Sequence, residues 1–246
     1  MPVLIHAANA NPLTRGGNNT WLLDGDEPVL VDAGVGATDH VEAIASALDG
    51  RPLAKVLVTH GHPDHAGGVP ALKERWPAVI AQKFLLQGES GWHPIVDGQR
   101  ITAGGEQVRA LWTPGHAADH VCFWNERTRE LFAGDMVIAG TTVMIPFGRG
   151  GNLADYLRSL EKMAELAPIR IFPGHGPVIE DPATLIREYI DHRVMRERQI
   201  LECLSDGVTE VEAIVERVYP DLAPALRPAA ALTVEAHLEK IRADGR

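Results

Sequence analysis

One segment of seven residues, 59–65, constrains this chain more than any other. Its sequence is Thr-His-Gly-His-Pro-Asp-His, and it follows the apolar run Val56–Val58. Three imidazoles and one carboxylate in six residues are more metal-type ligands than a solvated loop needs. Neutral imidazole and carboxylate suit Zn²⁺ or a similar first-row ion, and the segment contains no thiolate. It therefore predicts a metal site at the end of a strand.

Pro63 divides this segment into two pairs of ligands. Proline disfavours helical backbone at the residue before it, so we expect His60 and His62 in an extended stretch with their side chains on the same side. Proline also suits the first turn of a helix, where Asp64 and His65 would lie about 100° apart around the axis. The two pairs can therefore serve two neighbouring centres.

Three more candidate ligands follow apolar strands later in the chain. Two occur in the tripeptide Pro-Gly-His and the third in a Gly-Asp pair. Glycine lets the backbone approach a ligand closely, and open α/β sheets place their sites at strand ends. The complete prediction is one set of His60, His62 and His116, a second set of Asp64, His65 and His175, and a bridging position for Asp135.

The remaining histidines receive no metal in this interpretation. We expect surface or core positions for His6, His40, His192 and His237. Asp119 and His120 follow His116 closely enough to orient a ligand imidazole through a hydrogen bond, and simple packing is the alternative. Further candidates for the wall of the site are Arg149 in the loop 144–152, Trp92 and His93; an ordinary surface loop is the alternative for 144–152.

Apolar periodicity predicts an α/β chain with two comparable halves. Strands are expected near residues 20–23, 28–32, 56–58, 78–81, 108–112, 121–124, 131–133 and 169–172. Helices are expected at 39–48, 64–75 and 153–166. Beyond residue 182 only helical patterns remain, at 183–204, 208–218 and 229–242. We therefore divide the chain into an α/β domain that carries the candidate ligands, 1–182, and a helical domain, 183–246.

Composition excludes several other classes of protein. With 45% hydrophobic and 23% charged residues the chain is an ordinary globular one, and its net charge of −10 provides no basic surface for broad nucleic-acid or membrane binding. Cys122 and Cys203 lie in a strand-like and a helical run, so no disulfide scaffold is expected. The sequence shows no export signal and no apolar run of membrane-spanning length, which predicts a cytoplasmic protein.

The ligand pattern resembles that of the metallo-β-lactamase superfamily, which has a Thr-His-X-His-X-Asp-His motif and then spaced His, Asp and His. The resemblance covers about residues 1–180. It implies an αββα sandwich, with two β-sheets between helices and the metals at one edge. It also implies two Zn²⁺ ions, with Mn²⁺ or Fe as alternatives, held by the seven residues that match ligand positions of binuclear members: His60, His62, Asp64, His65, His116, Asp135 and His175.

The C-terminal part is similar to the branch of this superfamily that carries a small winged-helix domain. That branch includes metal-dependent endoribonucleases and uncharacterised bacterial hydrolases. The similarity rests on residues 155–160, 189–193 and 233–240, and on Asn11-Pro12 and residues 17–20 near the N-terminus. A wing hairpin is expected to be rudimentary or absent. Residues 206–246 hold eight acidic and five basic side chains, which argues against a nucleic-acid surface there.

The expected function is that of a binuclear metal-dependent hydrolase. A metal-bridging hydroxide would attack an ester, thioester or phosphodiester, and Asp64 would orient this nucleophile or carry its proton. The alternatives are a glyoxalase II-like thioesterase, a metal-dependent endoribonuclease, and a non-catalytic interaction protein. A small-molecule substrate is the expected partner, with RNA as the alternative. No membrane partner is expected, and a homodimer is an alternative to a monomer.

Overall fold

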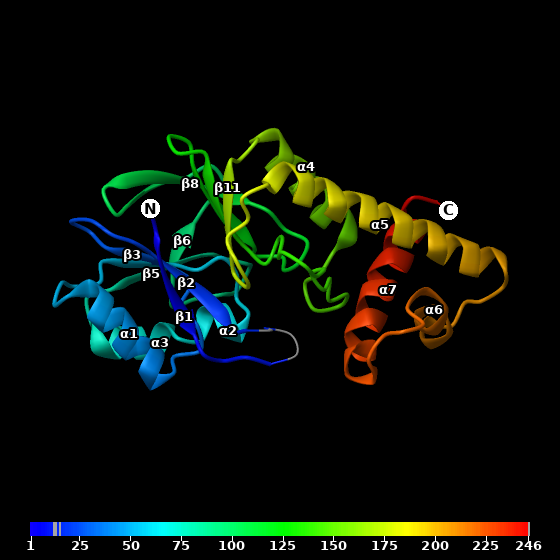
Figure 1. The fold of residues 1–246 in the computed structure, drawn as a ribbon, viewed down its shortest axis with the longest axis horizontal. Coiled ribbons are helices and arrows are strands. Elements are labelled where there is room, and N and C mark those ends of the chain that lie inside the picture. The colour runs from blue at the N-terminus through cyan, green and yellow to red at the C-terminus, as the bar shows by residue number, and fades with distance from the viewer. Residues whose placement is uncertain (12–13, 15, 246) are drawn as a thin grey trace.

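The computed structural model describes residues 1–11, 14 and 16–245, and two β-sheets face each other in it (Figure 1). The first sheet has the strand order β1-β2-β3-β4-β5-β6 and the second has β11-β10-β9-β8-β7. The first contains β1 (Val3–Ala7), β2 (Asn18–Leu23), β3 (Val29–Val31), β4 (Lys55–Leu57), β5 (Ile80–Phe84) and β6 (His93–Ile95). The second contains β7 (Arg100–Ala103), β8 (Glu106–Trp112), β9 (Val121–Asn125), β10 (Glu130–Gly134) and β11 (Arg170–Pro173).

The two sheets are joined at the edge where the parallel strands end. β3 to β6 pair in parallel, as do β10 and β11. Across this edge, the backbone N–H of Val121 donates to the carbonyl of Thr59 at 2.8 Å, and that of Asn19 donates to the carbonyl of Gly174 at 2.8 Å. The loops that follow β4, β10 and β11 are therefore held in one place.

Helices cover the outer faces of both sheets, and apolar side chains fill the layers between them. α1 (Thr38–Leu48) and α3 (Val69–Arg75) pack on the first sheet, and α4 (Leu153–Glu165) packs on the second together with the start of α5 (Pro182–Ser205) (Figure 1). The layer between the sheets includes Trp21, Val31, Phe123, Phe132 and Phe172. The order helix, sheet, sheet, helix confirms the predicted αββα sandwich.

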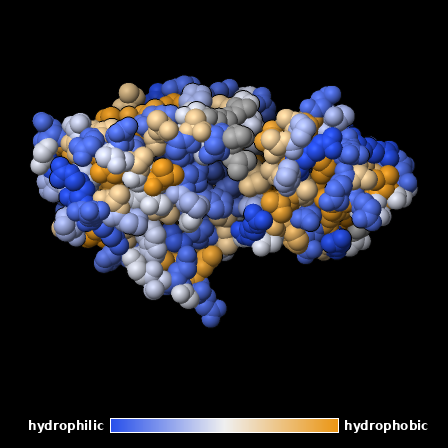
Figure 2. Space-filling view, turned by 90° about the horizontal axis from the view of Figure 1, so that it is seen from below, coloured by the Kyte–Doolittle hydropathy of each residue, from blue (hydrophilic) through white to orange (hydrophobic). Residues whose placement is uncertain are grey.

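The C-terminal helices build a separate apolar core against the end of α5. α6 (Val211–Val218) and α7 (Arg227–Ala243), with the short 3₁₀ helix η1 (Pro224–Leu226) between them, contribute Ile214, Val215, Val218, Val234, Leu238 and Ile241 to it. α5 links both parts, because Ile186 packs on the second sheet and Ile200 in the C-terminal core. The surface is hollowed where the two parts meet (Figure 2). No strand follows β11 in the described residues, so the wing hairpin is absent from them, as expected.

Two details differ from the sequence-based prediction. The helix expected over 64–75 is two helices, α2 (Pro63–Ala66) and α3, because the chain between them packs against the turn after β3: a Cβ on Gly68 would lie 2.1 Å from the carbonyl oxygen of Ala33. The strands β1, β6 and β7 were missed. All three are edge strands with exposed side chains, so their apolar pattern is weak.

Three further expectations concern the cysteines, membrane-spanning helices and Pro12. Both cysteines are free and buried, as expected. Among the described helices, none combines the length with the apolar character that crossing a membrane requires. Pro12, part of the N-terminal similarity, lies outside the described residues.

His237 of α7 is an imidazole buried in the C-terminal part. It is 0% exposed, and neither ring nitrogen has a hydrogen-bond partner among the described residues. Burial lowers its pKa to about 3, with further lowering by the charged or titratable side chains around it: Arg193, His192, Lys240 and Arg196. The folded chain therefore keeps His237 neutral.

This imidazole should make stability depend on pH. A group whose pKa is lower in the folded chain takes up its proton in the unfolded chain first as the pH falls. The contribution of His237 to stability is therefore complete above the unfolded pKa of about 6.5 and is lost as the pH falls toward 3. We expect the wild-type chain to lose up to about 1.4 kcal/mol of unfolding free energy per pH unit more than His237→Leu over this window. Urea unfolding at several pH values measures this difference. Equal slopes for the two proteins would contradict it.

Candidate metal centre

The seven predicted ligands meet at the joined edge of the two sheets. The loop after β4 and the helix α2 supply four of them, and the segments after β8, β10 and β11 supply one each. Their ligand atoms form a first group of His60, His62 and His116, a second group of Asp64, His65 and His175, and a set of His60, His65 and Asp135 that connects the two; within each, all atoms lie within 4.8 Å of one another. Every residue of the predicted set is therefore part of one cluster.

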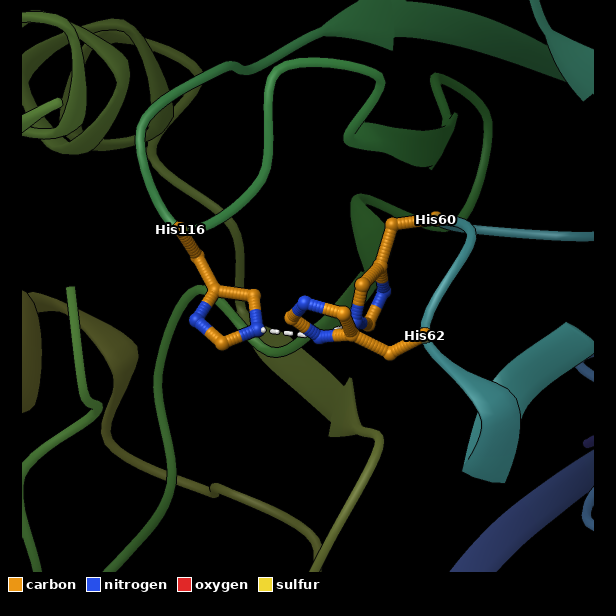
Figure 3. A group of neighbouring side chains, drawn as sticks. All are labelled: His60, His62 and His116. Atoms are coloured by element: carbon orange, nitrogen blue, oxygen red, sulfur yellow. Dashed lines mark hydrogen bonds between the residues drawn. The ribbon is translucent and has the colours of Figure 1, made fainter. Parts of the chain in front are cut away.

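The first group consists of three histidines whose rings turn toward one another (Figure 3). Nδ1 of His62 lies 2.9 Å from Nε2 of His60 and 3.0 Å from Nε2 of His116. Burial lowers the pKa of all three side chains, that of His116 to about 4. The imidazoles are therefore neutral, which is the form that binds a metal ion.

The second group combines two buried histidines with a more accessible carboxylate. Oδ2 of Asp64 lies 3.4 Å from Nε2 of His175 and 3.7 Å from Nε2 of His65. Nδ2 of Asn18 donates to the same oxygen at 3.1 Å. The Asp64 side chain is 24% exposed, so this group is open on the side of Asp64.

Asp135 lies between the two groups. Its Oδ1 is 3.4 Å from Nε2 of His65 and 3.5 Å from Nε2 of His175, while its Oδ2 is 3.7 Å from Nε2 of His116. Oδ1 is buried and forms no hydrogen bond with any described residue. A buried carboxylate oxygen in that state is costly unless a cation binds it. The residues present therefore fit divalent metal ions.

The charge balance of the second group also fits a cation. Burial lowers the pKa of His175, but the nearby carboxylates of Asp135 and Asp64 outweigh burial and raise it to about 10. Burial also lowers the pKa of His65, but the carboxylates of Asp135 and Asp32 outweigh burial and raise this pKa well above the usual value. Without a metal, the carboxylates therefore favour a proton on both nitrogens of each ring. A divalent cation would replace one proton on each ring, because metal-bound imidazole is neutral.

Hydrogen bonds on the far side of the rings fix their orientation. Nδ1 of His116 donates to the carbonyl of Met144 at 2.8 Å, and Nδ1 of His175 donates to the carbonyl of Gly17 at 3.0 Å. In the neutral form that binds a metal, each ring keeps its proton on Nδ1, and Nε2 carries the free lone pair that faces the cluster.

Asp32, directly after β3, is a site residue that the sequence analysis missed. It is buried and accepts hydrogen bonds from the Thr59 N–H at 2.8 Å, from Oγ1 of Thr59 at 3.0 Å and from Nδ1 of His65 at 2.7 Å. Oγ1 of Thr59 also lies 3.0 Å from Nδ1 of His60. One carboxylate thus orients His65 directly and His60 through Thr59. The signal available in the sequence was an acidic residue at a strand end, before Ala33-Gly34.

Asp119 and His120 support the cluster by packing and do not hydrogen-bond to a ligand ring in the described part of the chain. Asp119 pairs with the buried Nζ of Lys83 at 2.5 Å, beneath the ligand loop. His120 stacks on the ring of His60, with centroids 5.1 Å apart, and its Nε2 accepts the backbone N–H of Asp135 at 3.2 Å. The predicted hydrogen bond to a ligand imidazole is therefore not found among the described residues; His120 packs on one ligand ring and binds the backbone of another ligand.

The glycine of the second Pro-Gly-His is required by close contact, as predicted. A Cβ on Gly174 would lie 2.6 Å from Oδ1 of Asp135 and 2.6 Å from Cε1 of His65. At the first Pro-Gly-His, Gly115 has a φ of 135°, and a Cβ there would lie 2.3 Å from the backbone of Tyr156. No other residue type fits either position.

The cluster forms the floor of a cavity of about 570 Å³. The floor consists of His62, Asp64, His116, Asp135 and His175, and the C-terminal helices form part of the walls. Among the wall residues suggested by the sequence, Met144 of the loop 144–152 lines this cavity. The other candidates, Arg149, Trp92 and His93, are not among the residues that line it.

The chain matches two family models. The model described as "Metallo-beta-lactamase superfamily" matches residues 13–82 and 84–175, and the model "Beta-lactamase associated winged helix domain" matches residues 211–246. Together with the fold and the His/Asp cluster, these matches define the class of protein as a metal-dependent hydrolase. The chain belongs to the metallo-β-lactamase superfamily and carries its associated winged-helix domain.

Similar proteins are found over nearly the whole chain. The "Beta-lactamase-like protein 2 homolog" of Caenorhabditis elegans is 35% identical over 250 residues, which cover 96% of this chain and 82% of that protein. The "Atrochrysone carboxyl ACP thioesterase" of Aspergillus chevalieri is 35% identical over 230 residues, 88% of this chain and 72% of that protein. The crystal structure of a metallo-beta-lactamase family protein from Thermus thermophilus has a TM-score of 0.83 at 25% identity and covers 99% of this chain and 94% of its own.

Proposed function

We propose that this chain hydrolyses acyl thioesters at a binuclear metal centre. The observation that carries the proposal is that the His/Asp cluster forms the floor of a cavity whose walls are mostly apolar. One ion would be held by His60, His62 and His116 and the other by Asp64, His65 and His175, with Asp135 as the ligand shared by both. The similarity to a protein named as a thioesterase supports this choice of substrate.

The bound ions would supply an acidified water molecule and polarise the substrate carbonyl. Asp64 is the acidic residue that would orient this water. Burial raises its pKa, but hydrogen bonds from His175 and Asn18 and the charge of His65 together lower it below the usual value, so Asp64 is a carboxylate at neutral pH. It can therefore accept a hydrogen bond or a proton from the water but cannot donate a proton.

The lack of a proton donor for the leaving group also favours a thioester substrate. Apart from the ligands, the titratable side chains that line the cavity are Arg193 and Tyr219. Arginine stays protonated, and burial raises the pKa of Tyr219, so neither donates a proton readily near neutral pH. A thiolate leaves without prior protonation far more easily than an alkoxide, because a thiol has a pKa of only about 8.5.

RNA cleavage, the alternative function, finds little support in the cavity. A groove for single-stranded RNA combines several cations with aromatic side chains. Arg193 is the one cation among the described residues that line the cavity, and its guanidinium is buried against the carbonyl of Val143 and the ring of Tyr156. The walls therefore offer no track for phosphates.

Turnover of three substrates by the metal-loaded chain tests the proposal. We expect hydrolysis of decanoyl-coenzyme A, slower hydrolysis of S-lactoylglutathione and no cleavage of a single-stranded RNA. Asp64→Asn should lower kcat/KM for the decanoyl thioester by about 100-fold or more, because the acceptor for the proton of the water is lost. Metal-dependent RNA cleavage without thioester hydrolysis, or no turnover of any substrate, would overturn the proposal.

A further inference from the structure

We infer that the C-terminal helices select the length of the acyl chain, an inference that rests on the proposed function. The cavity extends from the metal ligands to the C-terminal part of the chain. There it is lined by Tyr219, Leu222, Leu226, Ala229, Ala230 and Thr233. The winged-helix part thereby forms a wall of the substrate site, and the wall it offers is apolar.

α7 has two apolar faces, and the spacing of its residues separates them. Leu226, at the N-cap, and three residues of the helix follow the pattern i, i+3, i+4, i+7 and line the cavity: Leu226, Ala229, Ala230 and Thr233. Another face carries Val234, Leu238 and Ile241 into the C-terminal core. The core thus accounts for this second face and also contacts Ala230, while the first face lines the cavity.

On the cavity face, Leu226, Ala229 and Ala230 have intermediate exposure, whereas Thr233 is buried. Tyr219, which also lines the cavity, has intermediate exposure as well, although apolar groups lower their free energy when water is removed. Apolar residues lie on the helical side of the hollow between the two parts (Figure 2). An acyl chain whose thioester carbonyl lies at the metal ligands would extend along this wall and displace that water.

Residue size on this wall would set the limit of chain length. Ala229 and Ala230 are small and leave space beside Leu222 and Leu226. A cavity of about 570 Å³ falls in the usual range for medium-sized ligands. Each methylene that enters such a site should raise kcat/KM about fourfold until the space is filled, after which longer chains gain nothing.

A series of acyl thioesters from butanoyl to tetradecanoyl tests this role. In the wild-type chain kcat/KM should rise with length and then level off or fall. Ala229→Phe should retain the butanoyl rate within about twofold and lower the dodecanoyl rate by about tenfold or more, because the ring occupies the space of several methylenes. The matched control is Ala213→Phe on the exposed side of α6, away from the cavity lining, which should leave the whole profile unchanged.

A binding measurement separates this inference from the proposed function. Isothermal titration of dodecanoate should show weaker binding to Ala229→Phe than to the wild type and to Ala213→Phe. If no thioester is hydrolysed, the proposed function fails and dodecanoate binding alone decides the inference. A flat chain-length profile in the wild type, an equal loss for all lengths in Ala229→Phe, or equal dodecanoate affinity in all three proteins would overturn the inference.

Discussion

Replacing His62 by alanine is expected to lower kcat/KM for the thioester about 1000-fold and to remove about one metal ion per chain. The physical reason is the central position of this ring in the first group. Nδ1 of His62 lies within 3.0 Å of the ligand nitrogens of both His60 and His116, so its loss leaves only two imidazoles and the shared Asp135 to hold the first ion. Metal content by mass spectrometry and steady-state kinetics on the same sample measure both effects.

His93→Ala is the matched control for this prediction. It removes an imidazole that is exposed at the start of β6 and does not line the cavity. We expect unchanged metal content and unchanged turnover. Full activity of His62→Ala at reduced metal content would show that the first ion is not needed for catalysis. Full metal content with full activity would remove His62 from the ligand set.

The ligand cluster could be predicted from sequence because each ligand stands in a local pattern. His60, His62, Asp64 and His65 share one short segment, and Pro63 fixes the geometry within it. His116 and His175 follow a Pro-Gly pair at a strand end, where the glycine marks a close backbone approach. Strands that run in the same direction then bring these ends to one edge, so local patterns were enough to assemble the set.

The residues that the sequence could not reveal act through contacts between distant segments. Asp32 lies 27 positions before Thr59 and carries no motif of its own, so only the parallel pairing of β3 and β4 shows its hydrogen bonds. The cavity wall on α7 was also hidden. Its small residues fit an ordinary helix, and the apolar pattern alone does not distinguish a face that packs on a core from one that lines a cavity.

Replacing Asp32 by alanine is expected to destabilise the chain by about 2–4 kcal/mol and to weaken metal binding by about 10- to 100-fold. The N–H of Thr59 would lose its acceptor in the interior. His65 would lose the group that holds its proton on Nδ1, and with it the preference for a free lone pair on Nε2. The backbone adds to the cost, because Asp32 has a φ of 64° and alanine is disfavoured there. Urea unfolding and a competitive zinc titration measure the two effects.

Asp32→Asn separates the two roles of this carboxylate. Asparagine tolerates the left-handed conformation and keeps one acceptor, but its NH₂ must face either the N–H of Thr59 or Nδ1 of His65. The backbone proton cannot move, whereas imidazole can transfer its proton to Nε2, so the NH₂ should turn toward His65. We therefore expect Asp32→Asn to recover most of the stability lost in the alanine variant while zinc affinity stays low. Wild-type zinc affinity in the asparagine variant would show that Asp32 supports the fold and does not set the tautomer of His65.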